Sequence, residues 1–248
     1  MTLEQRRVLI TGGGTGVGAS LARGFAAAGA DVVVVGRRRA PLDAVAAADP
    51  RIIACVGDVT DEADVVRVFT EFDAFDIVVA NAGAAESARL TSTSVDLWQR
   101  MLAVNVTGVF LTFREGLRQM RGRGWGRLIT VASTAGLKGY AYVSAYTAAK
   151  HAAVGLTRAV AQEVAGSGIT ANALCPGYVN TEMTERTIAN IVETTGKSHA
   201  DALDALIGTN PQRRLIEPAE VTAAALWLCG PRSEGINGQA IPIAGGEL

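Results

Sequence analysis

The sequence predicts an α/β fold in which seven parallel strands form a single doubly wound sheet with helices on both faces. Short runs of β-branched and other apolar residues recur along the 248 residues, and most are followed by an alanine-rich stretch of helical character. The runs are almost continuously apolar, as expected for strands that are covered by helices on both sides. The alternation of strand and helix is the pattern of a parallel sheet.

Each predicted strand is a short apolar run with turn-forming or polar residues at its ends. The first strand leads into a glycine-rich turn, and the helix expected after that turn covers residues 19–28. In chain order the predicted strands are Arg7–Thr11, Asp31–Val35, Arg51–Val56, Asp76–Ala80, Arg127–Ala132, Ile169–Leu174 and Gln239–Ile243.

The domain organisation is inferred from the segments that interrupt the alternation of strand and helix. No linker rich in proline or serine and no block of charge divides the sequence, so we expect one domain over residues 1–248. The segment from Asn180 to Pro211 departs from the pattern because it is polar and rich in threonine. Substrates bind beyond the carboxyl ends of strands in open α/β sheets, so residues 180–211 are predicted to form a substrate lid. A pair of solvated surface helices is an equally good interpretation.

Composition excludes several classes of function. Aromatic residues make up 5% of the chain, and 23 basic residues against 24 acidic ones give a net charge of -1, which disfavours nucleic-acid binding. Cys55, Cys175 and Cys229 are widely spaced without a CxxC pair, so we expect no metal site, no disulfide framework and a reducing, cytoplasmic location. No apolar run approaches the about 20 residues of a membrane helix, so no membrane partner is expected.

The turn after the first strand is rich in glycine and reads Thr11-Gly12-Gly13-Gly14-Thr15-Gly16-Val17-Gly18. Glycines let backbone amides approach a pyrophosphate, whose charge is favoured by the positive end of the following helix. The loop has no lysine and lacks the spacing of a P-loop, which argues against a transferred γ-phosphate. An ordinary glycine turn is the alternative. The loop predicts a dinucleotide site in a Rossmann-like fold, formed by Gly12, Thr15, Gly16, Val17 and Gly18.

The end of the second strand indicates which dinucleotide binds. Gly36 is followed by Arg37, Arg38 and Arg39, with no acidic residue among them. An acid at this place would bond the ribose 2′-hydroxyl of NAD, whereas guanidinium groups bind the 2′-phosphate of NADP. We therefore expect NADP(H), bound through Arg37 and Arg38, and leave NAD(H) possible. A solvated basic turn would explain the same residues.

Ser133, Tyr146 and Lys150 form a second cluster with a chemical purpose. Tyr146 and Lys150 are four residues apart and share one face of a helix, while Ser133 follows the preceding strand. A free tyrosine has a pKa of about 10 and is a poor base at pH 7, but an ammonium ~4 Å away could lower that pKa by about three units. Tyr146 could then exchange a proton with an oxygen held by Ser133 while hydride moves at the cofactor. An accidental surface pair is the alternative.

Several motifs in this order resemble the short-chain dehydrogenase/reductase family over essentially the whole chain. Besides the glycine loop, Ser133 and Tyr146 to Lys150, they are Asp58-Val59, Asn81-Ala82-Gly83, Asn105-Val106-Thr107-Gly108 and Pro176-Gly177-Tyr178-Val179-Asn180-Thr181. The resemblance implies that Asn105 completes a catalytic tetrad by supporting a water that relays protons to Lys150. It also implies a homotetramer.

The same resemblance assigns further cofactor contacts. Asp58 and Val59 would border the adenine, and Asn81, Ala82 and Gly83 would form the floor of the cofactor site. Pro176 and Gly177 would bind the cofactor together with Tyr146 and Lys150, and Val179 and Thr181 would contact its nicotinamide end. From the residues alone, Asp58 is equally well explained as an exposed capping residue after a strand. Asn105 lies within the apolar segment 101–113, so its side chain either has a functional role or faces solvent.

The substrate is expected to be a ketone or a secondary alcohol, since the chain is similar to 3-oxoacyl reductases and 3-hydroxybutyrate dehydrogenases. At the positions where the hydroxybutyrate enzymes have polar groups that bind a carboxylate, this sequence has Ala85, Ala135 and Val143. At the positions where carrier-protein reductases have docking arginines, it has Gly124 and Ser167. A 3-oxoacyl-CoA or a hydrophobic ketone is therefore favoured over a free hydroxy acid or an acyl carrier protein. The predicted substrate residues are Ser133, Tyr140, Tyr142, Val143, Tyr146, Tyr178 and Met183.

Other functions and residues compete with this interpretation. The nearest alternative is an NAD-dependent secondary-alcohol or hydroxy-acid dehydrogenase, and a lyase or epimerase that uses NAD(P) transiently is another. A non-catalytic nucleotide sensor or scaffold would need none of Ser133, Tyr146 and Lys150.

The remaining polar residues are expected to have no catalytic role. His151 is expected to point away from Tyr146, and His199 is expected at the surface. A helical stripe that is solvated or contacts another subunit is expected for Arg114, Arg118 and Arg121.

Overall fold

The computed structural model describes residues 2–248, and the strands in this part of the chain form one seven-stranded parallel sheet. The order across the sheet is β3-β2-β1-β4-β5-β6-β7. The strands are β1 (Arg7–Thr11), β2 (Asp31–Gly36), β3 (Ile52–Val56), β4 (Ile77–Ala80), β5 (Gly126–Val131), β6 (Ile169–Pro176) and β7 (Ala240–Ile243). The predicted fold class and the predicted strands are confirmed, with ends that differ by at most two residues.

The apolar runs form strands because most of them are buried on both faces. Every residue of β4, β5 and β6 is buried. The edge strands β3 and β7 contain exposed or half-buried residues, because each has a neighbour on one side only. The inner strands are therefore the ones in which a continuous apolar sequence is required.

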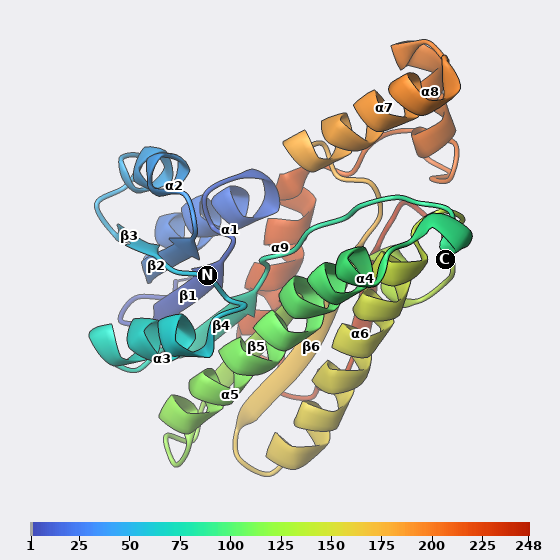
Figure 1. Ribbon diagram of the computed structural model, residues 1–248. Helices are drawn as coiled ribbons and strands as arrows, with labels where there is room; N and C mark the ends of the chain where they lie inside the picture. The colour runs from blue at the N-terminus through green and yellow to red at the C-terminus, as the bar shows by residue number, and fades with distance from the viewer. Residues whose placement is uncertain (1) are drawn as a thin grey trace.

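Helices cover both faces of the sheet (Figure 1). One face packs against α1 (Gly16–Ala27), α2 (Arg39–Ala46) and α9 (Pro218–Cys229), and the other against α3 (Glu62–Glu71), α5 (Gly108–Met120) and α6 (Ser144–Val164). Phe25 of α1 and Phe113 of α5, both almost fully buried, mark the two halves of the core. α4 (Val95–Leu102) runs into α5 through a π-helical turn, Ala103–Thr107.

The connections of the sheet place the site. The chain runs from β1 outward to β2 and β3, then returns to β4 on the other side of β1. The connections that follow the carboxyl ends of β1 and β4 therefore lead to opposite faces of the sheet and leave between them the crevice where ligands bind in doubly wound sheets.

The polar segment 180–211 contains two helices, α7 (Glu182–Thr195) and α8 (His199–Ile207). They follow the carboxyl end of β6 and stand out from the body of the molecule in Figure 1. Ile188, Ala202 and Leu206 form a small core between them. Asn190 Nδ2 of α7 donates to Ser87 Oγ, in the loop after β4, at 2.9 Å. A helix pair fits both interpretations of this segment, so its role as a lid stays a prediction.

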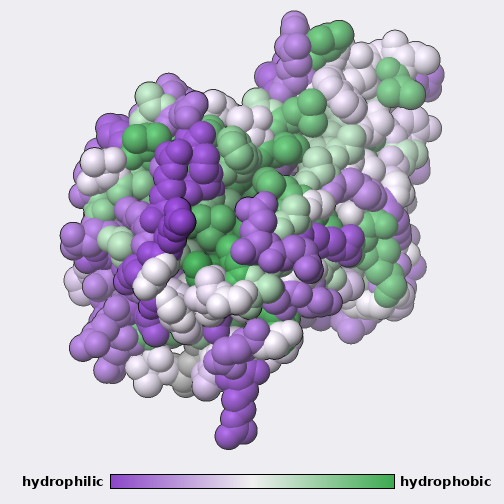
Figure 2. Space-filling view, turned by 90° about the horizontal axis from the view of Figure 1, so that it is seen from below, coloured by the Kyte–Doolittle hydropathy of each residue, from purple (hydrophilic) through white to green (hydrophobic). Residues whose placement is uncertain are grey.

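The remaining surface is mixed in character. Within residues 2–248, no helix is both long and apolar enough to cross a membrane. Figure 2 shows the side of the molecule where β5 and β6 begin, on which hydrophilic and hydrophobic residues lie in small patches. The thiols of Cys55, Cys175 and Cys229 are all buried.

Candidate active site and cofactor cleft

The glycine loop lies in the crevice between β1 and β4, and its glycines are required by close packing. Gly12 has a φ of 65°, and a Cβ there would lie 2.8 Å from Ala82 Cα. A Cβ on Gly18 would lie 2.2 Å from the carbonyl oxygen of Gly12. A side chain at either position would collide with backbone, so the loop can lie this close to α1 and to residue 82 only with glycine.

The start of α1 offers backbone amides to a ligand. Thr15 is the N-cap residue in an extended conformation, and its side chain makes no capping hydrogen bond. The first amides of the helix, from Gly16 to Gly18, thus have no side-chain cap, and the helix dipole is positive there. The side chain of Thr181 lies 3.1 Å from the place of a Cβ on Gly16, so the segment after β6 covers the loop from the opposite side. This arrangement fits a bound pyrophosphate.

Asn81 holds the loop in place. Its Nδ2 donates to the carbonyl oxygens of Thr11 and Gly12, at 2.9 and 3.2 Å. The amides of Asn81 and Ala82 both donate to Thr11 Oγ1, at 3.0 and 3.1 Å. Asn81 and Ala82 therefore join β4 to the glycine loop, and the side-chain amide of Asn81 donates its hydrogen bonds to the loop.

The arginine turn borders a hollow beside the glycine loop. Arg38 is the N-cap residue of α2, and both Arg37 and Arg38 are exposed. Arg39 pairs with Asp43 at 3.6 Å, whereas neither Arg37 nor Arg38 forms an ion pair with any residue in 2–248. The hollow is lined by Gly12, Gly14, Thr15, Gly36, Arg37, Arg38, Pro41 and Leu42. Two unpaired guanidinium groups next to this hollow fit the 2′-phosphate of NADP.

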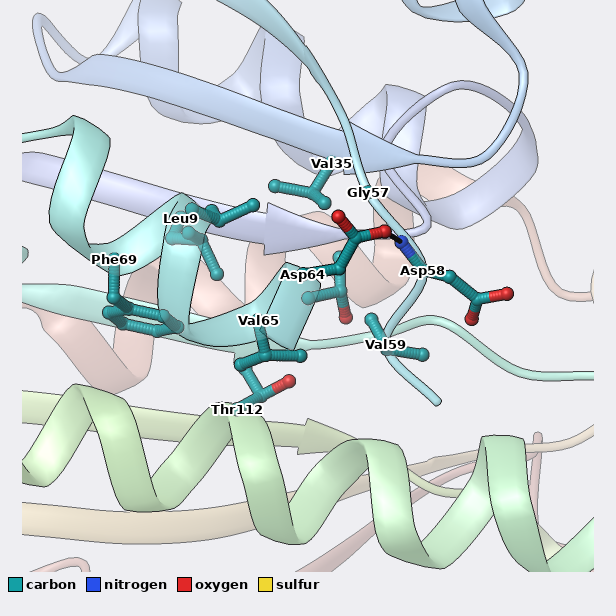
Figure 3. A pocket seen from close by; sticks show the side chains of 11 residues that line it. Leu9, Val35, Gly57, Asp58, Val59, Asp64, Val65, Phe69 and Thr112 are labelled. Atoms are coloured by element: carbon teal, nitrogen blue, oxygen red, sulfur yellow. Dashed lines mark hydrogen bonds between the residues drawn. The ribbon is translucent and has the colours of Figure 1, made fainter. Parts of the chain in front are cut away.

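Asp58 and Val59 line a second hollow, between β1, β2 and α3 (Figure 3). The Asp58 amide donates to Asp64 Oδ2 at 3.0 Å, which is the dashed line in Figure 3. The carboxylate of Asp58 accepts from the amide and the hydroxyl of Thr60, at 2.9 and 2.8 Å, and points away from the hollow. Asp58 thus stabilises the turn before α3, but it is half-buried and the N-cap residue of α3 is Asp61, so the interpretation as an exposed cap is wrong. Contact with adenine stays a prediction for Asp58 and Val59.

The four predicted catalytic residues converge from three parts of the chain. Ser133 follows β5, Tyr146 and Lys150 lie in the first turns of α6, and Asn105 lies in the π-helical turn before α5. Lys150 Nζ is 5.7 Å from the centre of the Tyr146 ring. The place of a Cβ on Gly83 is 2.9 Å from Asn105 Oδ1 and 3.5 Å from Lys150 Nζ, so these two polar atoms face one another across a glycine.

Asn105 faces the interior, which answers the question that the sequence leaves open. The residue is 0% exposed, and its Nδ2 donates to the carbonyl oxygens of Ala84 and Met101, at 2.9 and 3.0 Å. Its Oδ1 is buried and has no hydrogen-bond partner among the described residues. A buried acceptor without a partner costs about 1–3 kcal/mol, so the position is not explained by stability. π-helical turns of this kind are frequent at functional sites.

Burial sets the protonation of the tyrosine and the lysine. It raises the pKa of Tyr146 to about 12, although the nearby Ser133 hydroxyl acts in the opposite direction. It lowers the pKa of Lys150 to about 8, and Nζ donates to the carbonyl oxygen of Val131 at 3.0 Å. The expectation that Lys150 lowers the pKa of Tyr146 is therefore wrong for this structure, because loss of solvation disfavours the phenolate. At pH 7 Tyr146 is protonated and Lys150 is mostly cationic.

The predicted substrate residues differ in exposure and contacts. The charge of Tyr178 raises the pKa of Tyr146, as a smaller contribution than burial. The Tyr140 hydroxyl lies 2.7 Å from Thr134 Oγ1, beside Ser133. Val143 is half-buried, Tyr142 is 64% exposed and Met183 is 36% exposed.

One buried acidic side chain near Tyr140 is not among the residues predicted from the sequence. Glu247 accepts a hydrogen bond from the Tyr140 hydroxyl, and its side chain is 2% exposed. The Gly245-Gly246 pair just before it is a turn signal that could have indicated a chain reversal.

The other polar candidates are two histidines at the surface, a buried cysteine and an arginine stripe. His151 is exposed, with Nδ1 2.9 Å from the carbonyl oxygen of Thr147, and His199 is exposed beside Glu185. Cys175 is buried, which raises the pKa of its thiol to about 11 and leaves it a packing residue. Arg114 and Arg118 both pair with Glu115.

Comparisons with known proteins agree with this geometry. Residues 6–191 match the family model described as short chain dehydrogenase. The D-beta-hydroxybutyrate dehydrogenase of Rhizobium meliloti (strain 1021) is 34% identical, over 97% of this chain and 98% of that protein. The levodione reductase of Leifsonia aquatica is 35% identical, over 98% of this chain and 94% of that protein.

A solved structure with a bound dinucleotide is similar over the whole chain. The crystal structure of an actinorhodin polyketide ketoreductase variant with NADPH has a TM-score of 0.93 at 30% sequence identity, and the match covers 100% of this chain and 99% of that one. The protein therefore belongs to the short-chain dehydrogenase family and is an NAD(P)-dependent oxidoreductase that interconverts secondary alcohols and ketones.

Proposed function

We propose that this protein uses NADPH to reduce the ketone group of a hydrophobic substrate, such as a cyclic ketone or a 3-oxoacyl-CoA, to a secondary alcohol. The observation that carries the proposal is the convergence of Ser133, Tyr146, Lys150 and the buried Asn105 at the carboxyl end of the sheet. A nucleotide sensor or scaffold has no use for an unpaired buried amide oxygen beside a buried lysine.

The cofactor is proposed to bind along the crevice. The amides from Gly16 to Gly18 would bind the pyrophosphate, and Arg37 and Arg38 would bind the 2′-phosphate. NADPH, when bound, supplies the hydride. The NADPH in the actinorhodin ketoreductase structure supports this choice. NAD(H) stays the second candidate.

Tyr146 is proposed to be the proton donor. Its raised pKa keeps the phenol protonated at neutral pH, which is the form needed to protonate a ketone oxygen as it is reduced. The Ser133 hydroxyl accepts from the Ala135 amide at 3.1 Å, and its own hydrogen can be donated to the same substrate oxygen. The protonated phenol is therefore the form of Tyr146 that acts in the reduction.

Lys150 and Asn105 are proposed to restore the proton. Lys150 has a pKa of about 8 and can release a proton near neutral pH far more readily than an exposed lysine. Asn105 Oδ1 is the acceptor that a relaying water between the two residues would bind. Gly83 supports this role because any side chain there would fill the space between them.

The hydrophobic substrate is favoured by what the site lacks. Ala85, Ala135 and Val143 offer no cation or hydrogen-bond donor side chain to a free carboxylate. The name of the levodione reductase supports a ketone of this kind. The second candidate is an NAD-dependent hydroxy-acid dehydrogenase, which the name of the hydroxybutyrate relative favours.

We further propose that the chain acts as one domain whose segment 180–211 is a substrate lid, and that four copies associate. Val95, Trp98 and Phe110 are exposed apolar residues on α4 and α5, and Trp227 is 53% exposed on α9. A homotetramer with two kinds of subunit interface needs two separate apolar surfaces on each subunit, and these helix faces supply them. Mass photometry tests the expected homotetramer.

Cofactor absorbance in the presence of ketones tests the proposed reaction. A panel of cyclic and aryl ketones and 3-oxoacyl-CoAs is assayed with NADPH and with NADH. We expect NADPH oxidation with at least one neutral ketone and alcohol formed in equal amount. Bound NADPH that is never oxidised by any member would favour a sensor or scaffold, and substrate conversion without a net absorbance change would favour an epimerase.

A further inference from the structure

The last turn of the chain returns an acidic side chain to the interior. After β7, Gly245 and Gly246 have φ of 59° and 93°, and the Glu247 amide donates to the carbonyl oxygen of Ala244. A Cβ on Gly245 would lie 2.0 Å from Asn210 Oδ1, so the turn needs glycine there. The Glu247 side chain is 2% exposed although the residue is next to the carboxyl terminus. Burial of a carboxylate is costly unless partners are supplied.

The partners of this carboxylate come from the segment between Ser133 and Tyr146. Glu247 Oε1 accepts from the Tyr140 hydroxyl at 2.5 Å and lies 3.1 Å from Lys138 Nζ. The same Tyr140 hydroxyl contacts Thr134, which directly follows Ser133. The carboxylate is thus linked, through one phenol, to the residue next to the serine that is proposed to hold the substrate oxygen.

The other oxygen of Glu247 faces the segment that follows β6. Oε2 lies 3.2 Å from the place of a Cβ on Gly177, whereas the hydrogen bond from Tyr140 goes to Oε1. The charge of Glu247 adds to burial in raising the pKa of both Tyr140 and Tyr178. The contacts with Tyr140, which also reaches Thr134, and with Gly177 place the carboxylate between the segment that begins at Ser133 and the segment that follows β6.

The two charges of the Lys138–Glu247 pair are screened unequally by water. Lys138 has a side chain that is 37% exposed, so water screens its ammonium group. The carboxylate is enclosed and is screened far less. Ala85, Ala135 and Val143 add no positive side chain. Glu247 therefore makes the field on a substrate in this part of the site more negative, in opposition to the buried ammonium group of Lys150.

We propose that Glu247 is a specificity-determining residue that excludes substrates with a negative charge next to the reacting carbonyl and so selects neutral ketones. This inference rests on the proposed ketone reduction and names the substrate class of that same site. A 3-oxoacyl thioester and a cyclic ketone both satisfy it, because neither has an anionic group beside the ketone. A free 3-oxo acid does not.

Two ligands of nearly equal shape and different charge isolate the effect. Acetoacetate is an anion and acetoacetamide is its neutral counterpart. Their dissociation constants are measured by calorimetry on the protein loaded with NADP⁺, which cannot reduce either ketone. Glu247→Gln removes the charge and keeps the shape of the side chain. The matched control is Glu163→Gln, at an exposed position about 25 Å along α6 from Tyr146 by the rise of a helix.

We expect Glu247→Gln to reduce the preference for acetoacetamide over acetoacetate by about tenfold, the size expected for one charge about 10 Å away at an effective dielectric of about 20. Lys138→Met should increase the preference by about threefold, because it removes the screened countercharge. Glu163→Gln should leave it within about twofold.

Equal weakening of both ligands by Glu247→Gln, or an unchanged preference in both Glu247→Gln and Lys138→Met, would overturn the inference and leave a structural role for the turn. Failure of both ligands to bind any variant that still binds NADP⁺ would contradict the proposed ketone site itself.

Discussion

The cofactor half and the substrate end of this molecule are built in different ways. Most of the cofactor cleft is made of residues that are close in sequence: the glycine loop, the start of α1 and the arginine turn all lie within residues 11–42. Asn81 and Thr181 join it from the ends of β4 and β6. The substrate end joins Ser133 and Tyr140 with Tyr178 and Glu247, which come from separate segments of the chain. A local motif fixes the first region, whereas the second depends on how distant loops meet.

This difference explains what could be predicted. The strand of apolar residues, the glycine turn and the following helix identify one another in sequence, so β1, α1 and the arginine turn follow from the sequence alone. The YxxxK spacing places Tyr146 and Lys150 on one helix face without any tertiary information. Glu247 could not be predicted, because its burial depends on a turn that packs against Asn210 and Gly177.

The pKa of Tyr146 is where sequence reasoning is most clearly wrong. Sequence spacing supplies a lysine near the phenol but not the loss of solvation, which depends on everything packed around the pair. In the structure this burial dominates and raises the pKa to about 12. Protonation states are therefore a property of the tertiary structure, even where the residues themselves follow from a motif.

The largest effect is expected at the proton donor. Tyr146→Phe should lower kcat for ketone reduction by at least ~100-fold, because a general acid is lost, and should leave the dissociation constant of NADPH within about threefold. Stopped-flow absorbance and NADPH fluorescence measure the two quantities. Near-normal turnover would mean that another group supplies the proton.

The cofactor half is tested next, at the arginine turn. Arg37→Ala should weaken NADPH by about 10–100-fold and NADH by less than about threefold, since a charge-assisted hydrogen bond to phosphate contributes about 1.5–3 kcal/mol. Arg39→Ala is the matched control, because Arg39 pairs with Asp43. Equal losses for NADPH and NADH would place the 2′-phosphate elsewhere.

A smaller, graded effect is expected from pH. Burial lowers the pKa of Lys150 to about 8, so the lysine is protonated below this pH and loses its proton above it. We expect kcat for reduction to be level from about pH 6 to 7 and to fall above a midpoint of about 8, up to tenfold per pH unit. Lys150→Arg keeps the charge but does not release its proton, so it should lower kcat and remove the fall near pH 8. A rate in the unchanged protein that stays level to about pH 10 would contradict this role.

The smallest effect concerns the segment 180–211. Asn190→Ala removes the exposed hydrogen bond to Ser87 and should raise KM by about threefold with little change in kcat, as expected for a bond that contributes about 0.5–1.5 kcal/mol. Ser87→Ala should act equally, and the double variant should add nothing further. Additive effects would show that the two side chains act independently and would weaken the proposal of a lid.

The ionisation of Tyr146 tests the account most directly. An ultraviolet titration of tyrosinate compares the protein with its Tyr146→Phe variant and assigns the difference to this one phenol. With a pKa of about 12, Tyr146 should contribute no tyrosinate signal up to about pH 10. A tyrosinate signal that disappears with Tyr146→Phe and has its midpoint near pH 7 would contradict a protonated tyrosine as the proton donor for reduction.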